Sequence, residues 1–146
     1  MGAADSRIQE ISTTECNELL RTERVGRIGV IVRGRPEIFP VNYALDASGS
    51  ILFRTGVGMK LDAALNRQVV FEVDRLDEDM VAGWSVVVHG VAHQTERVAE
   101  GENPLVTFLD ETPHLIRISH SSVSGRRILP QARPSIPPPD GADIRS

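Results

Sequence analysis

The sequence predicts a mainly β fold, an antiparallel barrel or sandwich that carries a few short helices. Two observations support this prediction. Six segments rich in apolar and β-branched residues are mostly joined by short turn-forming sequences, and strands do not alternate regularly with long helices, as a parallel sheet requires. The predicted strands span residues 24–34, 38–45, 51–55, 68–74, 84–96 and 114–129.

Turn-forming residues separate these strands. Gly34 and Pro36 predict a turn that joins the first two strands as a hairpin, and the segment DASGS (46–50) predicts a turn before the third strand. The acidic segment RLDEDMVAG (75–83) is typical of a loop. Most connections are therefore short, as expected for an antiparallel sheet.

Short helices are expected between some of the strands. Ser12 and Glu15 have the spacing of a capping box, in which each side chain satisfies a free amide at a helix start, so a helix is expected over 12–22. Apolar residues at i, i+3 and i+4 predict a second helix over 59–66. Another helix could lie within 98–111.

Composition and charge argue against several classes of protein. The 146-residue chain has a net charge of −4 and only 4% aromatic residues, whereas nucleic-acid binders usually cluster basic and stacking side chains. No apolar run approaches the ~18 residues of a membrane span, and the first ten residues lack a secretory apolar region. Cys16 is the single cysteine, which fits a reducing compartment. We expect a cytoplasmic protein that binds neither nucleic acid nor membrane.

The chain is long enough for one folded domain with a real core. We expect a flexible N-terminus over residues 1–10 and the folded domain over residues 11–129. Residues 130–146 form a proline-rich tail with little to bury, which is typical of a disordered or extended segment.

The segment ILFRTGVGMKLDAAL (51–65) is the main candidate for an anion site. Arg54 and Lys60 supply positive charge, and Thr55 supplies a hydroxyl or an amide, where a predicted strand turns into a predicted helix. The glycines between them would let the backbone approach a phosphate closely. The same pattern also fits a plain solvated connection between strand and helix, and local residues leave both interpretations open.

Trp84 and Ser85 begin the longest predicted strand. Trp84 could stack on a planar ligand, or it could fill the core or an interface between subunits. Side chains alternate along a strand. One face should therefore carry Trp84, Val86, Val88 and Ala92, and the other Val87, His89, Val91 and His93.

Neither a metal site nor a catalytic residue can be assigned. His89 and His93 share a face but lie ~13 Å apart on a strand, too far to bind one ion. Cys16 fits a small buried side chain better than a nucleophile. The carboxylates Asp77, Glu78 and Asp79 fall in the acidic loop, where they most simply face water.

Six motifs occur in an order that points to a known family. They are RVGRIGV, FPVNYAL, ILFRTGVGMKL, VVFEVD, GWSVVVHG and GRRI. Together they resemble the pyridoxamine 5'-phosphate oxidase-like superfamily of FMN-binding split barrels, in its small actinobacterial branch related to nitroimidazole-resistance proteins. The resemblance covers roughly residues 10–129. It implies a six-stranded antiparallel split β-barrel that forms a homodimer, with flavin sites at the subunit interface.

The resemblance also implies a set of cofactor-binding residues. Those matching the FRT motif and the following lysine would hold the flavin phosphate, those matching PVN would lie beside the ring, and the GWS motif would approach from the same or the second subunit. The implied residues are Pro40, Val41, Asn42, Arg54, Thr55, Lys60, Trp84 and Ser85.

The implied function is that of an FMN-binding, flavin-dependent oxidoreductase acting on a small molecule of unknown identity. Authentic pyridoxamine phosphate oxidases resemble one another in a C-terminal segment of Arg and His residues. This chain has only GRR (125–127) and the proline-rich tail there, so oxidation of the vitamin phosphate is not expected. The alternatives are FAD as cofactor, a reductase that uses a deazaflavin coenzyme, and a non-catalytic module that binds flavin or haem.

Overall fold

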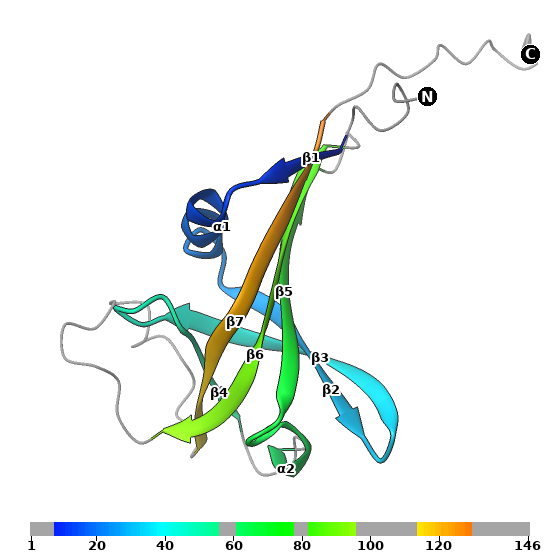
Figure 1. Ribbon diagram of the computed structural model, residues 1–146, viewed down its shortest axis with the longest axis vertical. Helices are drawn as coiled ribbons and strands as arrows, with labels where there is room; N and C mark the ends of the chain where they lie inside the picture. Colours follow the sequence, from blue (N-terminus) through cyan, green and yellow to red (C-terminus); the bar gives the residue numbers. More distant parts are fainter. Residues whose placement is uncertain (1–7, 56–60, 78–81, 96–113, 130–146) are drawn as a thin grey trace, which may run out of the picture.

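The computed structural model describes residues 8–55, 61–77, 82–95 and 114–129 of the chain, which contain seven strands and two helices. Figure 1 shows their arrangement. The elements are β1 (Ile8–Ile11), α1 (Thr13–Leu20), β2 (Val25–Val32), β3 (Arg35–Leu45), β4 (Ile51–Thr55), α2 (Leu61–Ala64), β5 (Gln68–Leu76), β6 (Gly83–Thr95) and β7 (His114–Ile128).

Six of the strands close into an antiparallel barrel. The sheet runs in the order β1-β7-β4-β3-β2-β5-β6, and β6 pairs back with β7 along its whole length. The mainly β fold and the six-stranded antiparallel split barrel are therefore confirmed, and the choice between barrel and sandwich is settled by the pairing of β6 with β7. Strand β1, which the sequence did not predict, pairs with the end of β7.

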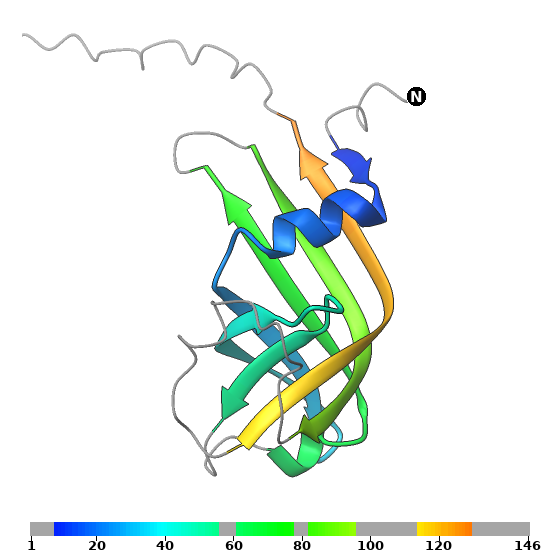
Figure 2. The same cartoon turned by 90° about the vertical axis from the view of Figure 1, so that its left-hand side faces the viewer.

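The barrel is split because β7 changes its neighbour along its length. Its first residues pair with β4 up to Ile118, and its last residues pair with β1 from Gly125 onward. Helix α1 lies across β6 and β7 on this second half of the sheet (Figures 1 and 2). The long strands β6 and β7 therefore connect the closed barrel to the part that carries α1.

Several predicted boundaries differ from the observed ones. Strand β3 starts at Arg35 because Arg33 (φ 52) and Gly34 (φ 78) make a tight turn that pairs Arg35 directly with Val32. The loop expected over 75–83 is shorter, since β5 runs to Leu76 and β6 starts at Gly83.

Helix α2 has four residues, fewer than the eight expected, and it ends at Ala64. The helix considered over 98–111 lies outside the described residues. So do residues 1–7 of the expected flexible terminus and residues 130–146 of the proline-rich tail, while strand β1 begins at Ile8.

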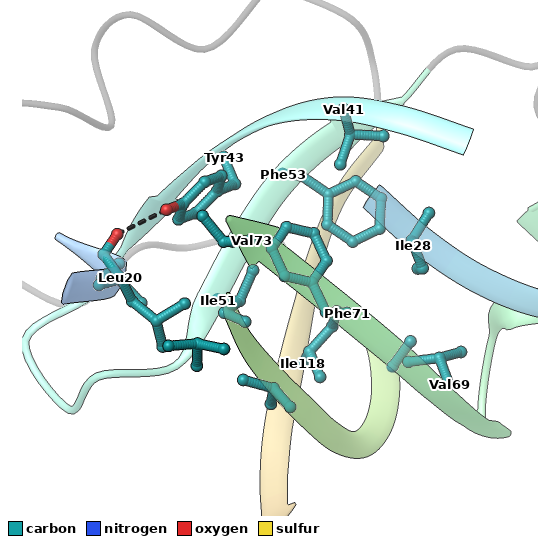
Figure 3. Close-up of a cluster of buried hydrophobic side chains, with 14 of the residues drawn as sticks. Leu20, Ile28, Val41, Tyr43, Ile51, Phe53, Val69, Phe71, Val73 and Ile118 are labelled. Carbon is teal, nitrogen blue, oxygen red and sulfur yellow. Dashed lines mark hydrogen bonds between the residues drawn. The ribbon is translucent and has the colours of Figure 1, made fainter. Parts of the chain in front are cut away.

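The core fills the barrel and continues beneath α1. Alternation along β6 was predicted correctly, because Trp84, Val86, Val88 and Ala92 are all buried. The rings of Tyr43 and Phe71 meet edge to face at the barrel centre, with centroids 5.2 Å apart (Figure 3). The largest fully buried side chains are Phe53, Phe71, Leu20, Ile28, Ile51, Leu52, Ile116, Ile118, Val73, Val86, Val88 and Cys16.

Helix α1 starts and packs as its sequence predicts. The Ser12 side chain accepts a hydrogen bond from the Glu15 amide at 3.2 Å, which is one half of the expected capping box. The Glu15 carboxylate binds Arg127 of β7 at 2.5 Å. Cys16 is fully buried against Gly125, and burial raises the pKa of its thiol, so it is the inert core residue that the sequence predicted.

The turn at residues 46–50 is organised by the buried carboxylate of Asp46. One oxygen accepts hydrogen bonds from the Ser48 amide (2.9 Å), the Ser48 hydroxyl (2.6 Å) and the Ser50 amide (2.9 Å). The other oxygen lies 3.2 Å from Nε of Arg117 on β7. Burial alone would raise the pKa of Asp46, but these hydrogen bonds and Arg117 lower it overall.

Candidate functional site

The residues matching PVN lie on β3, where side chains alternate between the core and the outside of the barrel. Val41 and Tyr43 point inward and are buried, whereas Pro40 and Asn42 point outward and are exposed. Asn42 lies opposite Val25 of β2, which is 51% exposed. Pro40 and Asn42 therefore belong to an accessible surface of the barrel, whereas Ala44, which also points outward, is buried.

Arg54 lies next to Asn42 on the same outer surface. The last pair of the β3–β4 ladder is Tyr43 with Phe53. Arg54 and Asn42 are the next residues beyond that pair, and extending the antiparallel register by one residue sets them opposite each other. Arg54 is half-buried and pairs with Leu115 of β7 on its other side. This juxtaposition brings together one cation and one amide from two segments that are separate in the sequence.

The other candidate residues of the segment 51–65 are Thr55 and Lys60. Thr55 ends β4 opposite His114 of β7. Lys60 lies outside the described residues. Helix α2 has only four residues, so the dipole that a longer helix would have supplied contributes little to anion binding here.

Trp84 and Ser85 lie on opposite faces of β6. The Trp84 side chain is 9% exposed and belongs to the core, so it offers little surface to a ligand within one chain. Ser85 points outward, opposite Asp74 of β5 on one side and Arg126 of β7 on the other. Of this pair, Ser85 is the residue on the outer surface.

One row of outward side chains runs around the barrel and connects these positions. Asn42 pairs with Val25, and Asp74 pairs with Ser85. Extending the registers of β3 with β4 and of β2 with β5 places Arg54 opposite Asn42 and Asp74 opposite Val25. We define the outer row as Arg54, Asn42, Val25, Asp74 and Ser85. Neighbouring strands are ~4.8 Å apart, so Ser85 is four strands, or ~19 Å along the sheet, from Arg54. The structure of one chain therefore brings Pro40, Asn42 and Arg54 together but leaves Ser85 and Trp84 apart from them.

The sequence reasoning missed a charged cluster beside this row. Arg27 of β2 lies 3.0 Å from the Glu72 carboxylate and 3.6 Å from the Asp74 carboxylate of β5. Burial, then hydrogen bonding to Asp74 and its charge, raise the pKa of Glu72 to about 7, against the opposing effect of Arg27. The alternation in the motif FEVD could have placed both carboxylates on one face, but not Arg27 beside them.

Other possible functions have less support in the described part of the chain. No group of three or more His, Cys, Asp and Glu side chains is arranged to hold a metal ion there. Among the same residues, none of the helices has the length and apolar character to cross a membrane. His93 lies 3.2 Å from the Asn66 side chain, between Nδ1 and Oδ1, and so has a partner of its own.

The chemistry of Arg54 and Asn42 in the outer row, with Pro40 beside them, suits a phosphorylated aromatic ligand. Arg54 offers charge-assisted hydrogen bonds to an anion, Asn42 offers an amide donor and acceptor, and Pro40 offers an apolar surface. The closed six-stranded barrel with α1 across its split half defines the class of protein, a split β-barrel.

The chain belongs to the pyridoxamine 5'-phosphate oxidase family, whose sequence model matches residues 12–127. It is 30% identical over 138 residues to an uncharacterized protein of Mycobacterium tuberculosis, covering 86% of this chain and 89% of that protein.

Solved structures of similar proteins agree with this assignment. The FAD-binding protein from Mycobacterium smegmatis is 36% identical, with a TM-score of 0.66 over 83% of this chain and 98% of that one. A conserved protein of unknown function from Corynebacterium diphtheriae is 33% identical, with a TM-score of 0.65 over 84% of this chain and 99% of that one.

Proposed function

We propose that this protein binds a flavin nucleotide on the outer surface of its barrel and uses it to oxidise or reduce a small molecule. The observation that carries the proposal is that Arg54 and Asn42 directly follow the paired residues Phe53 and Tyr43 on neighbouring strands, both on the outer face. Family membership and the relative that is named an FAD-binding protein support the flavin as ligand. FMN is the cofactor that the sequence motifs imply, and FAD is the alternative.

Each residue has a distinct role in this proposal. Arg54 binds the phosphate through charge-assisted hydrogen bonds, together with Thr55 and Lys60. Asn42 donates to and accepts from the polar edge of the ring, and Pro40 and the backbone of Val41 lie along its face. A bound flavin would supply the electron-transfer chemistry, while these side chains fix its orientation and restrict water.

A homodimer would complete the site. Ser85 and Trp84 lie about four strands from Arg54 in one chain. They would therefore contact a flavin held by Arg54 most simply if they came from a second copy of the chain. The outer surface of β2 and β3, from the row toward the far end of their hairpin, exposes large apolar side chains, with Val25 at 51%, Ile38 at 71% and Ile31 at 56%. Apolar surfaces of this kind are commonly buried between subunits.

The test is a set of titrations on the purified protein. Its visible spectrum is recorded first, and FMN, FAD, a deazaflavin coenzyme and haemin are then added separately. We expect FMN or FAD to bind, and the sedimentation profile to give a dimer. Binding of haemin or the deazaflavin coenzyme, with neither flavin bound, would overturn the proposal.

Two variants locate the site. Arg54→Gln should weaken flavin binding by about 10- to 100-fold, since one charge-assisted hydrogen bond contributes about 1.5–3 kcal/mol. Arg35→Gln is the matched control, because Arg35 lies seven positions from Asn42 at the far end of β3. Equal affinities in the two variants would remove Arg54 from the site. Reduction of the bound flavin by a nicotinamide donor under anaerobic conditions tests the oxidoreductase part.

A further inference from the structure

The cluster of Arg27, Glu72 and Asp74 has one cation for two carboxylates. Nη1 of Arg27 lies 3.0 Å from Oε1 of Glu72 and 3.6 Å from Oδ2 of Asp74. Glu72 and Asp74 are two residues apart on β5 and point to the same side, and their side chains are 30% and 31% exposed. Two carboxylates this close resist ionising together, so they tend to share one proton.

The cluster lies within the proposed flavin surface. Asp74 is a member of the outer row, and Arg27 pairs with Pro40 of β3, the residue proposed to lie along the flavin ring. The Arg27 side chain is 48% exposed and can therefore reach a ligand on this surface when it is not held by the carboxylates.

Few other titratable groups face the cluster. On β6, the positions opposite Glu72 and Asp74 are Val87 and Ser85, and His89 follows on the same face, opposite Val70. On β7, Arg126 lies opposite Ser85. The other outward ionisable side chains around the cluster therefore include His89, Arg126 and Arg54 of the outer row.

We propose that Arg27, Glu72 and Asp74 form a proton-controlled switch on the outer surface of the barrel. When both carboxylates are ionised, they hold Arg27 and the cluster carries one net negative charge. When they share a proton, the cluster is neutral and Arg27 is released to bind an anionic ligand. The effect on flavin binding rests on the proposed function, whereas the shared proton itself does not.

The shared proton is tested first without any flavin. The free energy of unfolding is measured for the wild type and for Glu72→Gln between about pH 5 and about pH 8. Because the folded protein holds a proton on Glu72 that the unfolded chain releases, the wild type should gain stability relative to Glu72→Gln as the pH falls from about 8 to about 5. Comparing the two proteins cancels the titration of all other groups.

A control variant shows whether the effect needs two carboxylates. Glu23 forms a pair with Arg75 at 3.7 Å on another part of the surface. Glu23→Gln should reproduce the wild-type slope of stability against pH. A constant difference between the wild type and Glu72→Gln across this range would overturn the switch, whatever the outcome of the flavin titrations.

The second arm measures flavin affinity at about pH 6 and about pH 8. FAD is the preferred probe because it has no terminal phosphate monoester, a group that itself titrates near pH 6. Wild-type affinity should be about threefold higher at the lower pH, and Glu72→Gln should keep the higher affinity at both. Arg27→Gln should have lower affinity and no such dependence.

The outcomes of the two arms are distinguishable. If flavin binds the wild type and Glu72→Gln with the same pH dependence, the switch does not control flavin affinity. The proposed function would still stand. A wild type that binds no flavin overturns the proposed function, and the unfolding measurements still decide whether the proton is shared.

Discussion

The Tyr43 hydroxyl donates a 2.6 Å hydrogen bond to the backbone carbonyl of Leu20, the last residue of α1 (Figure 3). Both residues are buried, and burial together with the charge of Glu23 raises the pKa of Tyr43, so the hydroxyl stays a donor at all ordinary pH values. A single side chain in the barrel thus fixes the end of the helix that covers the split half.

Tyr43→Phe should lower the free energy of unfolding by about 1–3 kcal/mol, because it leaves the buried Leu20 carbonyl without this donor. Denaturant unfolding followed by circular dichroism measures the change. Phe71→Leu is the comparison variant, since it removes the ring contact with Tyr43 while the hydroxyl can still donate. A Tyr43→Phe protein as stable as the wild type would show that the carbonyl finds water instead.

Gly125→Ala should destabilise the protein by about 1–3 kcal/mol through overpacking. A Cβ at this position would lie 2.5 Å from Sγ of Cys16, 3.3 Å from the Ser85 carbonyl and 3.4 Å from Ile11. Because the closest atom is a side-chain sulfur, the double variant Cys16→Ala with Gly125→Ala should recover most of the loss.

The same substitution at Gly90 offers a contrast. There a Cβ would collide with the backbone carbonyl of Ser119 on β7, which no side-chain truncation can move. The free energy of unfolding is measured for Gly125→Ala, for Gly90→Ala and for each of them combined with Cys16→Ala. If Cys16→Ala does not restore the stability of Gly125→Ala, the contacts with Ser85 and Ile11 cause the loss of stability.

His120 should make the protein less stable as the pH falls below about 6.5. Its Nε2 atom is buried without a hydrogen-bond partner, and burial lowers its pKa although Asp46 acts in the opposite direction. The unfolded chain therefore takes up the proton at a higher pH than the folded protein does. His120→Leu should lose less stability than the wild type between about pH 7 and about pH 5, and parallel curves would contradict this.

Asp46→Asn should lower the free energy of unfolding at neutral pH by about 1–3 kcal/mol, because an amide cannot pair with Arg117 as the carboxylate does. If the Asn oxygen kept the hydrogen bonds from Ser48 and Ser50, its NH2 group would face the guanidinium. The pKa of Asp46 is below its ordinary value of 3.8, so its contribution is present above that pH and is lost as the pH falls through the folded value. Asp46→Asn should therefore not show the loss of stability that protonation of Asp46 causes in the wild type. Unfolding of both proteins as a function of acid pH measures this difference.

Local patterns were sufficient to predict most of the fold. Alternation along β6 identified its inward side chains, and Ser12 identified the start of α1. Strand β1 was missed because its four residues have no alternation strong enough to detect, and only its pairing with β7 makes it a strand. The extra residue in β7 opposite His89 and Gly90 depends in the same way on a distant strand.

The candidate site was predictable only in part. The sequence motifs identified Asn42 and Arg54, but their adjacency comes from the register of β3 and β4. The contact of Arg27 with Glu72 joins positions 45 residues apart, which no local pattern encodes. Trp84 was considered for both ligand stacking and the core, and its side chain belongs to the core in a single chain.

Closure of the barrel through β6 and β7 also limits how this sheet can grow. An open sheet of this size would offer a long row of unpaired amides and carbonyls to any neighbouring strand, which promotes fibril formation. Within the described residues, β2 to β6 all have strand neighbours on both sides over at least three residues, and one end of the sheet is β1, which has only four residues. The largest stretch paired on one side alone is the part of β3 before Tyr43, which pairs with β2. Self-association of this protein should therefore proceed mainly through side-chain surfaces, and addition of a strand to the described sheet is confined to short edges such as β1 and the start of β3.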